Sequence, residues 1–346
     1  MSKIILLGDT HFMARNDNSV VAHWQRRFYK EIFWPYVEQH NIKTIIQTGD
    51  FFDSRKWLSI QGLANCREVF VDPSIQLGVT VHTIVGNHDI PLRHSLANNS
   101  VRQILSHNSN FHVHDTVKVV EFEDREITFM PWICKENEEC CTEVLKMGGD
   151  ILVGHFELQG ALMHPGAFCV EGLPPTKFSA WNSVISGHFH SQSEIGNVHY
   201  IGTPYQMSWN DAFTKHGFWV LDTSSGEKTF IENHLRYFHK LVWENGIKDE
   251  LPDLKNSYVK VTVKKKTDFE AFEKFLDKIN FNSPFEVKIT EDFEEYSADN
   301  VNDVIAILST EELIAGYVDD VAATNTDDIK KLMLEIYEES LVVEEE

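Results

Sequence analysis

Short apolar runs alternate with longer amphipathic stretches through the first half of the chain. The runs at 3–7, 43–47 and 79–85 have the length of buried strands. The stretch at 20–40 carries apolar and aromatic residues at helical spacing, and Pro35 is expected to kink or shorten that helix. Strands that alternate with helices in this way predict parallel strands covered by helices.

Beyond about residue 113 the predicted strands become shorter. The runs at 117–122 and 127–130 flank a charged tetrapeptide, and this pattern predicts a hairpin. Further strands are expected at 150–153, 183–186, 198–201 and 217–222. We therefore predict an α/β fold of layered α+β type, in which a two-sheet β-sandwich is flanked by helices.

The pattern divides the chain into three parts. Residues 1–243 form the first predicted domain, which ends with a strand at 237–242. A polar linker leads to residues 256–292, where strand, helix and strand patterns predict a small β-α-β domain. The segment 298–346 carries apolar stripes at helical spacing and predicts C-terminal helices, which either pack internally or bind a partner.

Five of the predicted strands end at a glycine that is followed by an aspartate, an asparagine or a histidine. Ligands of open α/β sheets collect outside the carboxyl ends of the strands, so we expect these polar side chains to converge at one sheet edge. Any single Gly-Asp or Gly-His pair is compatible with an ordinary turn, but the ordered set favours a metal site. The candidate metal ligands are Asp9, His11, Asp50, Asn87, His155, His188 and His190.

The donor set is too large for one ion that keeps open positions. Two carboxylates, one amide and four imidazoles suit two divalent ions that share one carboxylate. Oxygen and nitrogen donors without a thiolate favour manganese, iron, zinc or magnesium, and the several imidazoles disfavour a pure magnesium site. Such a pair of ions can clamp a phosphate and activate water for in-line attack on phosphorus, without a covalent enzyme intermediate.

Four further residues beside these ligands are candidates for catalysis or substrate binding. His88 is placed to donate a proton to the leaving oxygen or to stabilise the transition state. Asp53 is expected to hold His88 through a hydrogen bond, since carboxylates commonly orient imidazoles. Arg55 and Lys56 follow directly and are candidates for contact with the backbone of a phosphate-bearing substrate.

Charge and composition limit the function classes. The net charge of −22 argues against non-specific nucleic-acid binding by the whole surface, but residues 241–346 hold −16 of it, which leaves −6 for the first 240 residues. The charge therefore does not exclude that the first 240 residues bind a phosphate-bearing substrate. Five cysteines without a Cys-x-x-Cys pair favour a reducing cytoplasm. We expect no signal peptide and no membrane span, which would need roughly 20 apolar residues.

The ordered motifs resemble the calcineurin-like metallophosphoesterase superfamily. Within it the chain is similar to the SbcD-type nucleases, including the recombination endonuclease subunits of T-even-type phages. The resemblance is strong over residues 1–235 and rests beyond them on layout and size. The motifs that carry it are Asp9-x-His11, Gly49-Asp50-x-x-Asp53, Gly86-Asn87-His88-Asp89, Gly154-His155 and Gly187-His188-x-His190.

This resemblance implies a metal assignment. The family pattern puts Asp9, His11, Asp50 and His190 on one ion and Asn87, His155 and His188 on the other, with Asp50 bridging. His88 matches the family's transition-state histidine, and Asp53 matches the position that orients it in related phosphoesterases. The metal expected from the family is Mn²⁺.

The resemblance also implies an activity and partners. It implies Mn²⁺-dependent cleavage of DNA phosphodiester bonds by the catalytic subunit of an SbcCD-type recombination and repair complex. Residues 256–292 would be a capping domain, and 298–346 would dock on an SbcC-like coiled-coil ATPase. The resemblance further implies that two copies of the chain form a homodimer within a heterotetramer. The expected location is the cytoplasm, which is the host cytoplasm if the chain is phage-encoded.

Two other functions are compatible with the core motifs. The first is a phosphomonoesterase or cyclic-nucleotide phosphodiesterase, which leaves the acidic C-terminal extension unexplained. The second is a non-catalytic, metal-stabilised scaffold for the ATPase, which the complete ligand set disfavours.

Overall fold

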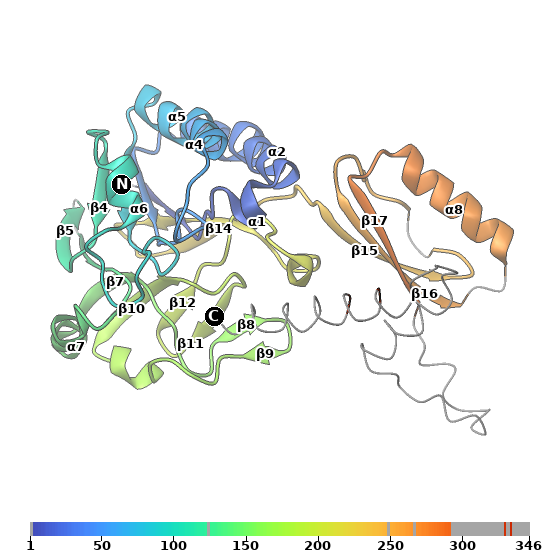
Figure 1. Ribbon diagram of the computed structural model, residues 1–346. Coiled ribbons are helices and arrows are strands. Elements are labelled where there is room, and N and C mark those ends of the chain that lie inside the picture. Colours follow the sequence, from blue (N-terminus) through green and yellow to red (C-terminus); the bar gives the residue numbers. More distant parts are fainter. Residues whose placement is uncertain are drawn as a thin grey trace, which may run out of the picture. The chain divides into compact units, whose positions relative to one another are not determined.

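Two six-stranded sheets form the framework of the protein (Figure 1). The computed structural model describes residues 3–122, 125–247, 250–265 and 268–291, together with positions 329 and 333. In spatial order, the first sheet consists of β14 (Lys228–Glu232), β13 (Gly217–Asp222), β1 (Lys3–Leu7), β2 (Thr44–Gln47), β3 (Thr80–Ile84) and β4 (Phe111–His114). Strands β1 to β4 are parallel, and β13 and β14 extend the sheet with antiparallel pairings.

The second sheet has a parallel centre and antiparallel edges. Its strands, in spatial order, are β11 (Ser193–Ile195), β12 (Val198–Tyr200), β10 (Trp181–Gly187), β7 (Gly149–His155), β6 (Arg125–Met130) and β5 (Lys118–Phe122). The hairpin predicted at 117–130 is confirmed by the antiparallel pair of β5 and β6. A separate two-stranded sheet, β8 (Leu162–His164) and β9 (Ala167–Phe168), follows β7 in the chain.

Both faces of the central strands are buried, which explains their continuous apolar runs. In β1, Ile4 and Leu6 pack with Phe129 and Val153 of the second sheet in a core between the sheets. Because side chains alternate along a strand, the neighbouring residues of β1 point to the opposite face and join the core under the helices. The predicted two-sheet sandwich with outer helices is therefore confirmed.

The helices cover the outer faces of the two sheets. On the first sheet lie α2 (Ser19–Phe28), α3 (Trp34–Gln39), α4 (Ile60–Cys66) and α5 (Asp72–Gln76) (Figure 1). Helix α7 (Glu138–Met147) packs its buried face on the second sheet. The shorter helices are α1 (Ala14–Asp17) and α6 (Ser100–Leu105).

Pro35 changes the helix in a way that the sequence did not predict. The helix is neither broken nor shortened there, because a π-helical turn, Tyr29–Phe33, joins α2 to α3. The amide of Trp34 donates to the carbonyl of Tyr29, one residue further back than in an α-helix. The wider turn separates the proline ring from the carbonyl it would otherwise crowd. The same turn recurs at Arg67–Val71, before Pro73.

A small sheet follows the sandwich in the chain. It orders β15 (Phe238–Glu244), β16 (Tyr258–Lys265) and β17 (Glu286–Glu291) in parallel, and α8 (Phe269–Phe281) connects the last two. We expected the strand at 237–242 to end the first domain, but it pairs with β16 instead. Strand pairing depends on partners distant in sequence, and the local pattern does not specify it.

The two ends of β15 belong to two different hydrophobic cores. Phe238 packs in the core under the helices of the first sheet, whereas Trp243 packs with Phe272 and Phe275 of α8. Met1–Glu291 accordingly form one compact unit, and Asp292–Glu346 form another. The predicted domains 1–243 and 256–292 both lie within the first unit.

The predicted C-terminal segment 298–346 lies outside the described residues except for Ile329 and Met333, which are both helical. All five cysteines are free thiols. Within the part of the chain that the structure describes, no helix is both long and apolar enough to cross a membrane.

We predict that the folded protein loses stability as the pH falls below about 6.5, because His82 and His114 resist protonation. Their Nδ1 and Nε2 atoms lie 3.0 Å apart, and burial lowers the pKa of each imidazole from 6.5 to about 3. The unfolded chain binds protons at these rings near pH 6.5, so unfolding takes up protons between pH 6.5 and 3. The expected loss between pH 7 and 5 is about 2 kcal/mol per histidine.

Urea unfolding at several pH values measures this effect. A variant with both His82→Phe and His114→Phe should lose clearly less free energy of unfolding between pH 7 and 5 than the unmodified chain. His107→Phe, at an exposed position, is the control and should follow the unmodified chain. Equal pH dependence in the double variant would contradict the prediction.

Candidate metal centre

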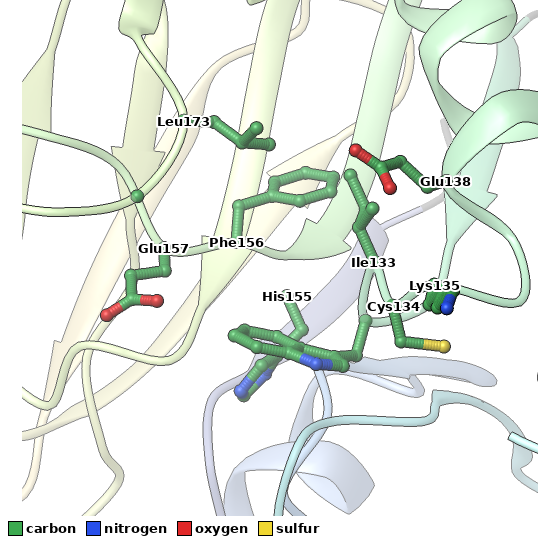
Figure 2. Close-up of a pocket in the computed structure, with 10 residues that line it drawn as sticks. Ile133, Cys134, Lys135, Glu138, His155, Phe156, Glu157 and Leu173 are labelled. Atoms are coloured by element: carbon green, nitrogen blue, oxygen red, sulfur yellow. The ribbon is translucent and has the colours of Figure 1, made fainter. Parts of the chain in front are cut away.

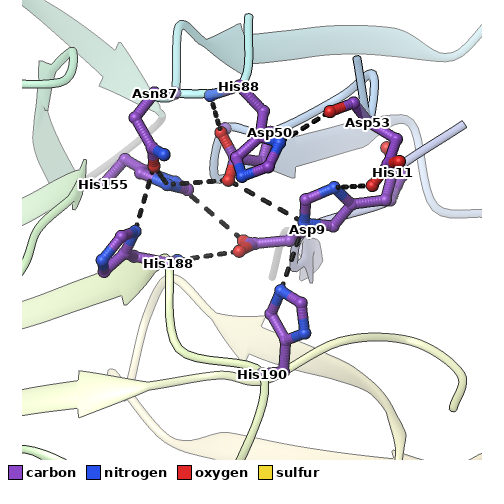
Figure 3. A network of polar contacts seen from close by, with 12 residues as sticks. Asp9, His11, Asp50, Asp53, Asn87, His88, His155, His188 and His190 are labelled. Atoms are coloured by element: carbon purple, nitrogen blue, oxygen red, sulfur yellow. Dashed lines mark hydrogen bonds and ion pairs between the residues drawn. The ribbon is translucent and has the colours of Figure 1, made fainter. Parts of the chain in front are cut away.

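The strands that carry the candidate ligands are divided between the two sheets. Strands β1, β2 and β3 belong to the first sheet, and β7 and β10 belong to the second. We expected one edge of a single sheet, and this expectation was wrong. The side chains still converge, because the carboxyl ends of these strands meet where the two sheets face each other (Figure 3).

The first group of donors contains Asp9, His11 and His190, whose potential ligand atoms lie within 4.8 Å of one another. The Nε2 atoms of His11 and His190 are 3.2 Å apart. Two ligands of one ion with bonds of about 2.1 Å are separated by about 3.0–3.4 Å, so this spacing fits a shared ion. Oδ1 of Asp9 is buried and has no hydrogen-bond partner among the described residues.

The second group of donors contains Asp50, His155 and His188, and Asn87 joins it. Oδ1 of Asn87 lies 3.0 Å from Nε2 of His155 and 3.0 Å from Nδ1 of His188. Oδ2 of Asp50 lies 3.2 Å from the same Nε2 atom of His155. Figure 3 shows these side chains directed toward one another.

The tautomer of His155 decides what this arrangement can hold. Its Nδ1 lies 2.9 Å from the carbonyl oxygen of Thr48, which can only accept, so Nδ1 carries the hydrogen. In the neutral ring Nε2 then presents a lone pair to the oxygen atoms of Asp50 and Asn87. Three electron-pair donors that face one another without a hydrogen between them fit a cation.

Asp50 lies between the two groups. Its Oδ1 accepts a hydrogen bond of 2.7 Å from the amide of His88, which fixes the carboxylate. Its Oδ2 lies 3.8 Å from Nε2 of His11 in the first group and 3.2 Å from Nε2 of His155 in the second. One carboxylate oxygen thus faces both groups.

Burial and charge act against each other in this pocket. Burial raises the pKa of Asp9 to about 7, although His155 acts to lower it. For Asp50 burial acts to raise the pKa, but the charge and hydrogen bond of His155, together with the charges of His11 and His88, outweigh it and hold the pKa below its usual range. Burial alone would lower the pKa of His11 and of His155, but their acidic neighbours raise each to about 9. The carboxylates therefore draw positive charge into the pocket.

Two glycines leave room for the carboxylates. A Cβ atom at Gly86 would lie 2.2 Å from Oδ1 of Asp50 and 2.3 Å from its amide nitrogen. A Cβ atom at Gly187 would lie 2.4 Å from the unpartnered Oδ1 of Asp9. The backbone of Asp50 itself has φ of 50°, a left-handed conformation that is strained for a residue with a side chain. Glycine is thus required here for space.

Asp53 contacts a different histidine from the one expected. Its carboxylate Oδ1 lies 3.0 Å from Nδ1 of His11, and so it orients a candidate metal ligand. His88 is held instead by the backbone carbonyl of Asp53, which lies 2.6 Å from its Nδ1 (Figure 3). The rings of His11 and His88 pack edge to face with centroids 5.0 Å apart. Sequence spacing placed these residues together correctly but could not select which oxygen meets which ring.

Asp89 has a structural role that the sequence pattern did not assign. It is fully buried, and its carboxylate accepts hydrogen bonds from the amides of Phe51, Phe52 and Gly86. These bonds tie the loop after β2 to the loop after β3. Burial raises the pKa of Asp89 to about 7. The one sequence feature that could have indicated this role is the position of Asp89 in the Gly-Asn-His-Asp motif.

Arg55 and Lys56 lie in the loop between β2 and α4. Arg55 is half-buried and Lys56 is exposed. Among the ion pairs of the described residues, neither side chain is paired with a carboxylate. Both positive charges therefore remain available to a substrate.

Comparison with known proteins defines the family. Residues 2–192 match the model of the calcineurin-like phosphoesterases, and the chain therefore belongs to this family. Exonuclease subunit 1 of Enterobacteria phage T4 is 30% identical over 333 residues, which cover 96% of each chain. The recognised superfamily and the metallophosphoesterase fold are thereby confirmed, and the chain is a hydrolase of the phosphoesterase class.

Two solved structures are similar at a low level. One comes from a study of an archaeal phosphodiesterase, with 15% identity, a TM-score of 0.34, and coverage of 67% of this chain and 99% of the other. The second is glutamine-dependent NAD⁺ synthetase from Acinetobacter baumannii, with 7% identity, a TM-score of 0.28, and coverage of 98% and 73%. TM-scores this low carry no argument about the fold.

We predict that Gly86→Ala abolishes or strongly weakens binding of divalent metal, because the added methyl group displaces the Asp50 carboxylate. Titration calorimetry with Mn²⁺ and elemental analysis measure the effect. Gly166→Ala is the control: a Cβ atom there has nothing within 4 Å, and the strain of its φ of 87° falls on the exposed turn between β8 and β9 and not on the metal centre. If Gly86→Ala bound Mn²⁺ as tightly as the unmodified chain, the proposed crowding would be wrong.

Proposed function

We propose that this chain is a divalent-metal-dependent DNA nuclease, the catalytic subunit of an SbcCD-type recombination and repair complex. The observation that carries the proposal is the pair of donor groups that share Oδ2 of Asp50. The substrate class is supported by the name of the T4 relative, an exonuclease subunit that matches over 96% of both chains.

In this proposal each donor group holds one divalent ion, most favourably Mn²⁺. Asp9, His11, Asp50 and His190 hold the first ion, and Asn87, His155 and His188 hold the second, with Asp50 shared. When bound, the two ions would polarise the phosphate and make water a stronger nucleophile. The oxygen and imidazole donors of the two groups fit these ions.

His88 is the proposed catalytic acid. The carbonyl of Asp53 fixes a hydrogen on Nδ1, so Nε2 is the atom that can face the substrate. Donation of a proton from Nε2 to the leaving oxygen requires the doubly protonated ring, whose charge also stabilises the phosphate oxygens. The half-buried position of His88 beside His11 places it next to the first donor group.

Asp53 is a positioning residue for the first donor group. Its carboxylate Oδ1 lies 3.0 Å from Nδ1 of His11, and this ion pair directs Nε2 of the ring toward His190 and Asp50. Arg55 and Lys56 contact the phosphates of the substrate on the same side, since their loop follows directly from Asp53.

We predict that His88→Ala lowers Mn²⁺-dependent DNA cleavage by about 10²- to 10⁴-fold while the content of bound metal is unchanged. The measurement is cleavage of single- and double-stranded oligonucleotides, with elemental analysis of the same preparations. His107→Ala, an exposed histidine, is the matched control. Full activity of a metal-loaded His88→Ala protein would remove the assigned role. Turnover of phosphomonoesters or cyclic nucleotides in preference to DNA would replace the nuclease proposal.

The partner in the proposal is an SbcC-like coiled-coil ATPase, with a homodimer of this chain in the complex. The T4 relative is named a subunit, and the acidic segment 298–346 contains none of the candidate site residues. We predict that a chain ending at Glu291, the boundary of the first compact unit, keeps its bound metal but loses affinity for the ATPase. Co-purification and titration calorimetry test this, and equal affinity of both chains would refute the docking role.

A further inference from the structure

A pocket of about 490 Å³ adjoins the metal centre. It shares His155 with the second donor group and extends along the loop that joins β6 to α7. Its lining includes apolar side chains of that loop and of the segment after β7, among them Ile133, Phe156 and Leu173 (Figure 2). The volume lies within the range typical of small-ligand sites.

The aromatic wall of the pocket is Trp132. Its ring centroid lies 5.3 Å from that of His188 and 5.9 Å from that of His155. The indole is half-buried, so part of it stays accessible. The aromatic surface of Trp132 therefore lies directly beside any ligand atom that is held at the second donor group.

Trp132 is held in place by the backbone. Its amide donates a 2.9 Å hydrogen bond to the carbonyl of Val85, the residue directly after β3. Its carbonyl accepts a 3.0 Å bond from the side chain of Asn137, whose other side-chain atom accepts from the amide of Cys134. These bonds fix the backbone that carries the indole, and the ring itself packs against His155 and His188, so binding of a flat ring costs little conformational entropy.

The charges that line the pocket indicate which part of a substrate it accepts. Glu138 and Glu157 lie on either side of the Phe156 ring in Figure 2, and Lys135 is the one lysine or arginine of the lining. Two carboxylates against one ammonium disfavour a phosphate. A nucleobase is uncharged, offers a face for stacking, and has amino groups that donate to carboxylates.

We propose that this pocket binds the base of the nucleotide adjacent to the scissile phosphate, with Trp132 as the stacking surface. The inference rests on the proposed nuclease function, because the phosphate at the second donor group brings the attached nucleoside to the pocket. A base in this position must leave its duplex stack, so the substrate is single-stranded or unpaired at the point of cleavage.

The test uses dinucleotides, which have one scissile bond. Deoxyadenylyl-deoxyadenosine is compared with two analogues in which one or the other nucleoside is replaced by an abasic sugar. With Mn²⁺, loss of the base at one of the two positions should lower kcat/KM by about 5- to 100-fold, and loss at the other should have little effect. Cleavage of both analogues within about twofold of the parent would overturn the proposal.

Variants assign the effect to the pocket. Trp132→Ala should bring the ratio between parent and sensitive analogue close to one, and Trp132→Phe should preserve most of it. Phe213→Ala, an exposed aromatic residue at a different cavity, should leave the ratio unchanged. An unchanged ratio in a folded Trp132→Ala protein would overturn the role of the indole.

Binding gives a readout that does not depend on turnover. A dinucleotide with 2-aminopurine at the sensitive position, or at each position in turn, should change in fluorescence on binding to the unmodified protein and not on binding to Trp132→Ala. If the protein cleaved no DNA, the nuclease proposal would fail and this titration alone would decide the pocket. Equal fluorescence changes in both proteins would reject it.

Discussion

Mutual repulsion among electron-pair donors is the constraint on which the rest of the structure depends. Nε2 of His155 faces the oxygen atoms of Asp50 and Asn87, and its other nitrogen is already committed to the carbonyl of Thr48. Two carboxylates are buried in the same pocket. Such a cluster is stable only when positive charge enters it, as protons or as metal ions, since buried charges require compensation.

The fold supplies this pocket through two sheets. Parallel strands bring loops from both sheets to one place, and each loop is tied to its neighbour by hydrogen bonds. Asp89 joins two loops of the first sheet. The amide of His188 donates a hydrogen bond of 2.9 Å to Asp9 and so links the two sheets. These bonds hold the donors close against their repulsion, and Gly86 and Gly187 leave them the necessary space.

The sequence predicts the strands that carry the donors, the sandwich and the seven donors that the structure brings together, because each donor follows a local pattern of apolar run and glycine. It does not predict relations between distant parts. Three such relations depend on tertiary packing. They are the division of the strands over two sheets, the pairing of β15 with β16, and the contact of the Asp53 carboxylate with His11 rather than His88. The proposed role of Trp132 depends on the cavity beside it, which only the structure shows.

The most direct test of the central claim is the number of Mn²⁺ ions bound per chain, measured by elemental analysis and equilibrium titration. If two cations share Asp50, the unmodified protein binds two ions, and Asp50→Asn loses at least one of them, because the amide offers a single neutral oxygen in place of the shared carboxylate. A single ion in the unmodified chain, or two ions of unchanged affinity in Asp50→Asn, would contradict the account.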